Sequence, residues 1–298
     1  MNRVRAATWA GVAAIVLWSS LALLTVATGP LPPFQVLAIG FGIAGLCGTA
    51  LTAARGRVGW REWRVPPAAL ALTSAGLFGY HALYFFALKR APAVEANLIN
   101  YLWPLLIVLF SALLPGVRLR AGNVVGALLG FAAAALLIAG GASATAGQGA
   151  LPGYAAALLA AVAWAGYSVL NRRFADMPGS AVVPACLVVA LLGALAHLAF
   201  EHTVLPSVPQ WIALAVMGLG PVGIAFRLWD RGTRHGDLAL LGSLSYLAPL
   251  LSTALLIAAG RTQTRWTQAV AVVLLTVGAW LSMRASATPR GQPPDAPE

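Results

Sequence analysis

YLWPLL at residues 101–106 recurs in this chain as YLAPLL at residues 246–251, an offset of 145 residues. Trp18 matches Trp164 at nearly the same offset, 146 residues. Matches that recur at one fixed distance along a chain indicate two copies of one structural unit. The sequence therefore predicts a fold that is built by using a single unit twice.

The composition places the chain in a membrane. Of its 298 residues, 60% are hydrophobic and 9% are charged, whereas about 25% are charged in soluble domains. The lipid tails of a bilayer must therefore surround most of the chain. The net charge of +11 does not indicate a nucleic-acid partner, because the basic residues stand singly or in small groups between apolar runs, as topology signals do.

Ten apolar stretches follow one another along the chain. Each is about 20 residues long, which is the length that a helix needs to cross the hydrocarbon core of a bilayer. We predict an all-α membrane protein with ten transmembrane helices, at residues 7–27, 34–54, 67–88, 93–114, 122–141, 152–171, 180–200, 208–229, 237–259 and 266–284.

The distribution of positive charge predicts the orientation. Fifteen of the nineteen Lys and Arg residues fall in the N-terminal segment, the even-numbered loops and the C-terminal segment. The odd-numbered loops carry only Lys89, Arg90, Arg261 and Arg265. Positively charged loops are retained in the cytoplasm. We therefore predict a multi-pass protein of the bacterial inner membrane with both termini cytoplasmic.

Each copy of the repeated unit holds five predicted helices. Because five is odd, the second copy enters the membrane upside down relative to the first. We assign residues 1–146 to the first five-helix repeat, 147–284 to the second, inverted repeat, and 285–298 to a disordered cytoplasmic tail. Inverted repeats of this kind are typical of secondary transporters, whose substrate site lies near the bilayer midplane between the repeats.

Proline and glycine are expected to shape individual helices. Pro104 and Pro249 are predicted to kink their helices near the middle, which frees carbonyl groups to face a cavity. Gly122, Gly126 and Gly130 are predicted to let the fifth helix pack closely against a neighbour, and we assign them no role in substrate binding.

Four predicted helices carry aromatic and hydrogen-bonding side chains at spacings that place them on one helix face. Polar groups are costly in hydrocarbon, so such faces turn towards the protein interior and mark substrate pathways. We predict that these faces, drawn from both repeats, line one cavity. The candidate substrate-binding residues are Tyr80, His81, Tyr84, Asn97, Asn100, Tyr101, Trp103, Trp164, Tyr167, Ser245 and Tyr246.

Several of these residues have a plainer interpretation that stays open. Asn97 and Asn100 could serve as hydrogen-bonding glue between helices, and His81 could bond across a helix interface. Glu95 lies on a different face of its helix from Asn100, so we interpret it as structural. Tryptophans near the segment ends are assigned to the interfacial belt, namely Trp9, Trp60, Trp63, Trp211, Trp229 and Trp266.

The candidate residues suit a solute with an aromatic or apolar body and a zwitterionic end. Aromatic faces bury the body and attract an ammonium group, while Asn and Ser orient the polar end without a fixed charge. No Arg or Lys lies deep inside a predicted helix, where it could meet a phosphate. The sequence also lacks a metal-ligand cluster, a phosphate-binding loop and a nucleophile elbow, so we expect no enzyme, no metal and no cofactor.

Three groups of residues carry a resemblance to a known family. IVLWS at 15–19, VE at 94–95 followed by NYLWP at 100–104, and HGD at 235–237 followed by SYLAP at 245–249 resemble the YddG-type aromatic amino acid exporters. These exporters belong to the EamA branch of the drug/metabolite transporter (DMT) superfamily. The resemblance covers the whole chain, and it implies ten helices in two inverted repeats, a central substrate cavity and export of aromatic and other neutral amino acids.

We therefore predict a secondary transporter that exports aromatic and other neutral amino acids from the cytoplasm by alternating access. The alternative is efflux of cationic aromatic drugs or dyes; against it, the first helix lacks the Glu on which small multidrug relatives depend. The predicted partners are an amino acid substrate and membrane lipid, and a monomer is compatible with the pattern. The preferred amino acids and any coupling to protons are left open.

Overall fold

A computed structural model of the chain describes residues 3–61, 63–111, 121–142, 150–170, 182–235, 248–261 and 265–287. Within these ranges the regular structure is helical throughout, with no strand. The prediction of an all-α fold is confirmed for this part of the chain.

The helices follow the predicted apolar stretches closely. Six helical stretches of the described residues are long and apolar enough to cross a bilayer: 3–27, 33–54, 67–90, 151–170, 182–200 and 208–229. The elements are α1 (Arg3–Ser19), α2 (Leu21–Ala27), α3 (Pro33–Ala54), α4 (Gly56–Arg61), α5 (Pro67–Arg90), α6 (Ala93–Asn100), α7 (Trp103–Ser111), α8 (Ala121–Ala142), α9 (Leu151–Leu170), α10 (Val182–Phe200), α11 (Val208–Leu219), the π-helical turn η3 (Gly220–Ile224), α12 (Ala225–His235), α14 (Ala248–Ala258) and α15 (Trp266–Ala287).

The fourth predicted helix is broken into α6 and α7. Its hydrogen-bonding pattern changes at Tyr101 and Leu102, which form a turn between the two helices. Pro104 explains the break, because its ring would clash with the carbonyl of residue 100 in a continuous helix. In the structure Pro104 is instead the second residue of α7, where its missing N–H costs nothing. Where a kink was predicted, the structure has a break, and Pro104 stands in the first turn of the helix that follows.

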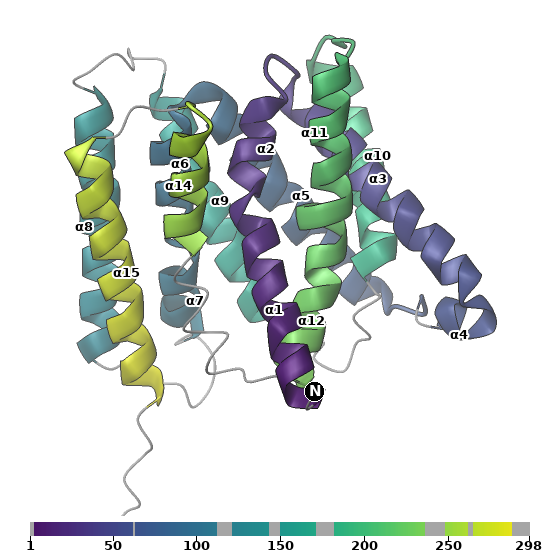
Figure 1. Ribbon diagram of the computed structural model, residues 1–298, viewed down its shortest axis with the longest axis horizontal. Coiled ribbons are helices and arrows are strands. Elements are labelled where there is room, and N and C mark those ends of the chain that lie inside the picture. Colours follow the sequence, from purple (N-terminus) through teal and green to yellow (C-terminus); the bar gives the residue numbers. More distant parts are fainter. Residues whose placement is uncertain are drawn as a thin grey trace, which may run out of the picture.

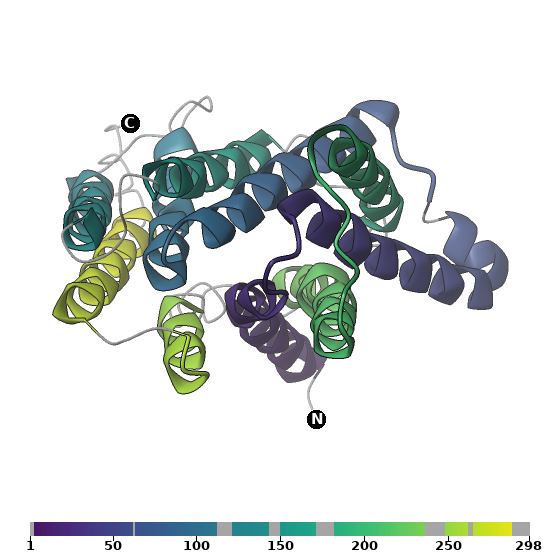
Figure 2. The ribbon, with the colours of Figure 1, turned by 90° about the horizontal axis from the view of Figure 1, so that it is seen from above.

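The helices run side by side between two ends, which Figure 1 shows as upper and lower. The N-terminus lies at the lower end, from which α1 and α2 rise, and α11 and α12 descend next to them. The most extensive pairings join α1 with α12, α3 with α10, α5 with α9, and α8 with α15. Figure 2, seen from above, places α8 and α15 at one end of the molecule and α3 and α4 at the other.

The outer surface of this bundle is strongly apolar. Large side chains such as Leu46, Leu128, Leu191 and Leu198 are 60% or more exposed. In a soluble protein so many exposed leucines would promote aggregation, whereas in a bilayer they face lipid tails. The surface and the six long apolar helices together support a multi-pass membrane protein.

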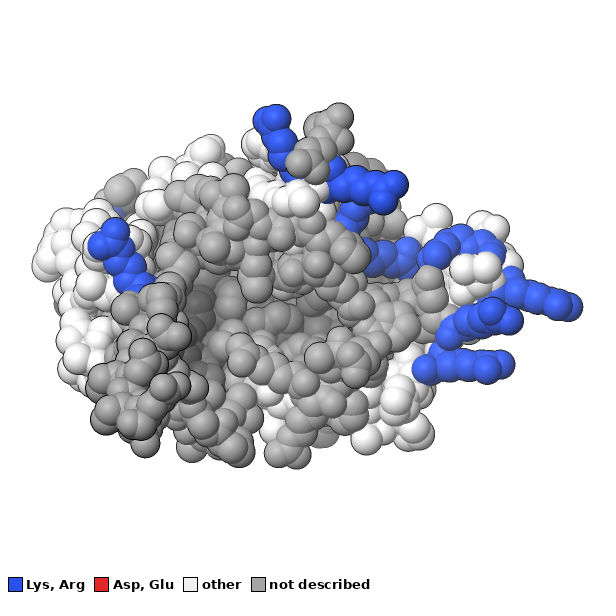
Figure 3. All heavy atoms as spheres, turned by 90° about the horizontal axis from the view of Figure 1, so that it is seen from below, with Lys and Arg blue, Asp and Glu red and all other residues white. Residues whose placement is uncertain are grey.

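Arginines gather at the lower end (Figure 3). They come from the start of α1, from the segment around α4, from α12 and from the end of α15. Those whose side chains the structure describes are Arg3, Arg5, Arg55, Arg57, Arg61, Arg64, Arg227, Arg231 and Arg284. The four basic residues that the sequence places in odd-numbered loops lie elsewhere: Lys89 and Arg90 end α5, Arg261 follows α14 and Arg265 precedes α15. The charge asymmetry of the sequence is thus also an asymmetry between the two ends of the bundle.

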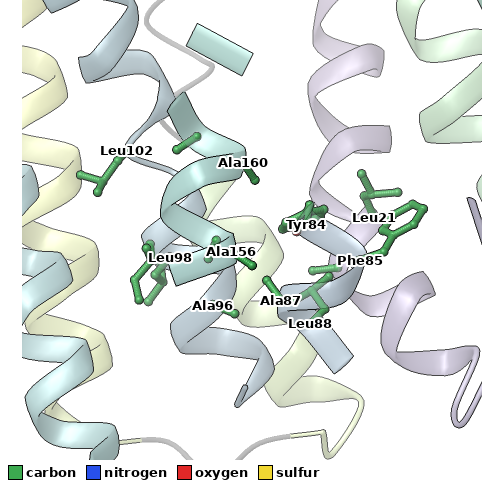
Figure 4. Packing of buried hydrophobic residues seen from close by; sticks show 14 of the residues in the cluster. Leu21, Tyr84, Phe85, Ala87, Leu88, Ala96, Leu98, Leu102, Ala156 and Ala160 are labelled. Carbon is green, nitrogen blue, oxygen red and sulfur yellow. The ribbon is translucent and has the colours of Figure 1, made fainter. Parts of the chain in front are cut away.

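Small residues hold α5, α6 and α9 together beneath the upper end. Ala87, Ala96 and Ala156 are almost fully buried in one cluster with Leu88 and Leu98 (Figure 4). Short side chains at such interfaces let helix backbones approach closely, which increases van der Waals contact between helices that lipid would solvate equally well.

Glycines create an even closer contact between α8 and α15. A Cβ atom added to Gly278 would lie 2.6 Å from the carbonyl oxygen of Gly126, and one added to Gly122 would lie 2.7 Å from Cβ of Ala285. The close packing predicted for the fifth helix is confirmed at these positions.

We predict that Gly278→Ala lowers the stability of the protein by about 1–3 kcal/mol, because α8 and α15 must separate to admit the methyl group. The matched control is Gly79→Ala in α5, where an added Cβ meets nothing within 4 Å. Thermal unfolding in detergent measures both variants. Equal melting temperatures for the two variants would contradict this account of the interface.

Candidate functional site

One cavity of about 290 Å³ lies among the helices, and its wall is largely aromatic. Seven helices of both sequence repeats contribute to the wall, together with the end of α6. The lining residues are Ile15, Trp18, Leu21, Tyr80, His81, Tyr84, Asn100, Tyr101, Trp103, Ile107, Trp164, Ser168, Phe226, Trp229 and Ala248. We call this space the aromatic cavity.

Seven of the eleven candidate residues line the aromatic cavity: Tyr80, His81, Tyr84, Asn100, Tyr101, Trp103 and Trp164. Asn97 and Tyr167 do not line it, but each contacts a residue that does. Ser245 and Tyr246 fall outside the described residues. The structure thus gathers side chains from α5, α6, α7 and α9, whose sequence positions span 84 residues between Tyr80 and Trp164.

Trp164 is the centre of the aromatic wall. Its ring lies 4.9 Å from that of Tyr80 and 6.5 Å from that of Trp103, both in the first repeat. It also lies 6.2 Å from the ring of Phe226 in the second repeat. The contact with Trp103 is edge-on, which is a favourable geometry for aromatic pairs, and the other two are tilted. Together they make Trp164 a bridge between the two parts of the wall.

Sequence reasoning missed the opposite side of the wall, and it assigned Trp229 to the interfacial belt. That assignment was wrong, because Trp229 lines the cavity with its ring 5.3 Å from that of Trp18. Phe226 packs against the same Trp18 at 5.6 Å. The repeat contained the signal that finds them: at the offset of 145, Trp229 corresponds to Tyr84 and Phe226 to His81.

His81 is buried between aromatic rings. Its imidazole meets Phe41 and Tyr80 edge-on, with centroids 4.7 Å and 4.8 Å apart. Nδ1 lies 2.9 Å from the carbonyl oxygen of Leu77 one turn earlier. Because a carbonyl only accepts, Nδ1 carries the hydrogen, and in the neutral ring Nε2 is then an acceptor. The bond is within α5, so it does not join two helices.

The two asparagines of α6 differ in their hydrogen bonds. Asn97 Oδ1 accepts from Tyr84 Oη at 2.5 Å, and Asn97 Nδ2 donates to Ser252 Oγ at 2.8 Å. Asn97 therefore ties α5, α6 and α14 together, as expected of polar glue between helices. Asn100 Nδ2 donates to Tyr80 Oη at 3.0 Å, but Asn100 Oδ1 is buried without a partner.

Glu95 lies away from the aromatic cavity, as its helix face predicted. It is 2% exposed in the first turn of α6, and its Oε1 accepts from Nε2 of Gln268 in α15 at 3.1 Å. A carboxylate in the first turn of a helix is also favoured by the helix dipole. Glu95 therefore joins α6 to α15 through its hydrogen bond with Gln268.

The model of the EamA-like transporter family matches this chain twice, at residues 4–139 and at residues 151–284. The chain belongs to the EamA-like transporter family. The predicted resemblance within the DMT superfamily is confirmed, and so is the expectation that the protein is a transporter rather than an enzyme.

Relatives in this family cover nearly the whole chain. The aromatic amino acid exporter YddG of Ancylobacter novellus is 50% identical over 276 residues, which are 92% of this chain and 95% of the relative. The protein of the same name from Salmonella typhimurium is 27% identical over 299 residues, 93% of this chain and 98% of the relative. A solved crystal structure that is 47% identical superposes with a TM-score of 0.73 and covers 95% of this chain and 99% of the other.

We predict that Ser252→Ala destabilises the protein by about 1–3 kcal/mol, because it leaves the buried Nδ2 of Asn97 without an acceptor. The neighbouring Thr253→Val is the matched control, since the buried Oγ1 of Thr253 has no hydrogen-bond partner. Thermal unfolding of both variants in detergent tests the difference. A loss as large in Thr253→Val would mean that Ser252 contributes by packing alone.

Proposed function

We propose that this EamA-family transporter exports aromatic and other neutral amino acids from the cytoplasm by alternating access through the aromatic cavity. The observation that carries the proposal is the wall itself. Eight tryptophan, tyrosine and phenylalanine rings line the space, and none of its described lining residues is an acid, a lysine or an arginine. Such a wall favours a solute with an apolar or aromatic body and no net charge.

The names of the relatives support the same substrate class. Proteins called aromatic amino acid exporters align with this chain along more than nine tenths of its length. The polar groups of the cavity fit an amino acid head, because they are amide, hydroxyl and imidazole groups that hydrogen-bond a zwitterion without attracting a net anion.

We infer ten transmembrane helices in two inverted five-helix repeats. The double match to the family model, with a boundary near residue 146, supports this division. Helix pairing supports it further. If the repeats correspond, α9 is the counterpart of α1, and α5 is the counterpart of α11 and α12. The structure has both matching contacts, because α1 packs on α12 and α9 packs on α5. The two remaining major pairs, α3 with α10 and α8 with α15, each join helices that would correspond to one another. Pairing that is unchanged when the repeats are exchanged is the pattern that a pseudo-twofold axis produces.

We also propose that the lower end faces the cytoplasm and that the described state is open in that direction. The arginines of the lower end favour this orientation. On the upper side, the hydrogen bonds of Asn97 with Tyr84 and Ser252 join the repeats next to buried Leu21 and Phe85. Below them, Tyr80, Trp103 and Trp164 of the wall are only half-buried. Release on the upper side would require this bridge to open, as alternating access demands.

We predict that Trp164→Ala lowers transport of phenylalanine and tryptophan by about tenfold and of alanine or threonine much less, because a large side chain loses its central aromatic surface. Uptake into liposomes that contain the purified protein, with amino acids of graded size, measures this difference. The matched control is Trp266→Ala, which removes an indole that is 71% exposed at the start of α15.

Efflux of cationic aromatic dyes is the second candidate function, and the same wall favours it through cation–π attraction. Dyes in the uptake panel distinguish the two functions. Transport of dyes without transport of amino acids, or equal effects of Trp164→Ala on all sizes of amino acid, would contradict the proposed substrate class.

We predict that Glu95→Gln retains at least about half of the wild-type transport rate, since Glu95 contacts Gln268 rather than the cavity and an amide preserves its shape. The assay is uptake into liposomes with and without a pH gradient. Complete loss of transport in a well-folded variant would instead assign a proton-binding role to Glu95.

A further inference from the structure

Asn100 and Tyr80 form a fixed pair in the wall of the aromatic cavity. Asn100 ends α6 and is 2% exposed, and Tyr80 reaches it from α5. The amide nitrogen Nδ2 donates to Tyr80 Oη at 3.0 Å, which sets the orientation of the amide. Both residues line the cavity. The bond therefore holds two polar groups at neighbouring points of a largely aromatic surface.

Each member of this pair keeps one unused hydrogen-bonding group. The carbonyl oxygen Oδ1 of Asn100 is buried and has no partner. Tyr80 Oη accepts from Asn100, and among the described residues its own hydrogen is donated to no recorded acceptor. A buried acceptor that stays empty costs free energy, so its retention in a cavity wall calls for a ligand that brings an N–H or O–H donor.

Asn97, three residues earlier in the same helix, shows the contrast. Its oxygen and its nitrogen are both used, by Tyr84 and Ser252. Sequence spacing treats the two asparagines alike, but only Asn100 has an acceptor left for a solute. The structure therefore separates an asparagine that joins helices from a buried asparagine that borders the cavity with an unused acceptor.

We propose that Asn100 and Tyr80 together recognise the zwitterionic head of an α-amino acid. The ammonium group donates to Asn100 Oδ1, and Tyr80 donates its hydroxyl hydrogen to the carboxylate. An α-amino acid carries a strong donor and a strong acceptor on one carbon atom, and the pair offers the complementary acceptor and donor on adjacent side chains. The wall of Trp164 and Trp103 takes the side chain, and its ring faces add attraction for the ammonium group. This inference rests on the proposed function. It adds the two side chains by which the protein would distinguish an amino acid from analogues that lack the amine or the carboxylate.

The test compares three solutes of nearly equal size with the full-length protein in liposomes. Phenylalanine has both charged groups, phenylalaninamide lacks the carboxylate, and 3-phenylpropionate lacks the amine. We expect wild-type protein to prefer phenylalanine over each analogue by about tenfold or more, because a site that is built to hydrogen-bond a group rejects the analogue without it.

Two variants of similar shape should each weaken a different preference. Asn100→Leu removes the acceptor, so the preference for phenylalanine over 3-phenylpropionate should fall by about tenfold. Tyr80→Phe removes the hydroxyl and leaves Oδ1 in place, so the preference over phenylalaninamide should fall more than the preference over 3-phenylpropionate. Ratios between solutes are compared within each variant, which cancels differences in the amount of folded protein.

Tyr154→Phe is the matched control. Tyr154 is a buried tyrosine whose Oη has no partner, but it lines a separate apolar groove between α6, α8 and α9 rather than the aromatic cavity. Its variant should keep the wild-type ratios. Binding of the three solutes in detergent, followed by the fluorescence of the cavity tryptophans, gives the same ratios for any variant that folds but does not transport.

The outcomes separate the two levels of the proposal. Wild-type protein that moves no amino acid overturns the proposed function. Wild-type protein that prefers phenylalanine, together with unchanged ratios in Asn100→Leu and Tyr80→Phe, overturns the assignment of this pair while the proposed function stands. A loss of the two preferences in the two different variants supports the pair as the reader of the amino acid head.

Discussion

A polar group within the hydrocarbon core of a bilayer must find its partner inside the protein, and the interior of this bundle is arranged around that requirement. Asn97 meets it completely, because Tyr84 and Ser252 use both ends of its amide. Asn100 meets it only in part, since Oδ1 is left empty at the cavity wall. The complete set of hydrogen bonds at Asn97 joins helices, and the incomplete set at Asn100 is where we propose that the solute binds.

The same requirement explains where the backbone is allowed to break. Unwound backbone in a membrane protein is tolerated where it is buried or borders a cavity. The turn at Tyr101 and Leu102, which Pro104 imposes between α6 and α7, meets this condition because Tyr101 and Trp103 both line the aromatic cavity. One predicted helix, divided in the structure into α6 and α7, thus contributes both an amide and two aromatic rings to the wall.

Helix packing outside the cavity depends on small residues rather than on hydrogen bonds. Lipid solvates leucine as well as another helix does, so close approach of backbones at Gly126 and Gly278 supplies the van der Waals contact that holds α8 against α15. Around the cavity the packing is different, because large aromatic rings keep the helices apart. Trp164 alone contacts rings from α5, α7 and α12. Tight glycine contacts at one end of the bundle and wide aromatic contacts in its interior therefore coexist in one fold.

The sequence by itself determined that lipid surrounds the chain, where its helices lie and which side chains share a helix face. Composition requires lipid around the chain, and apolar stretches of helical length place the helices. Helical spacing groups Tyr80 with Tyr84 and Asn97 with Asn100. All three conclusions depend only on residues that are close to one another along the chain. Only the tertiary structure decided what each face meets. It moved Trp229 from the predicted lipid interface to the cavity wall, and it distinguished Asn97 from Asn100, because a side chain's partners come from helices distant in sequence and spacing along one helix carries no information about them.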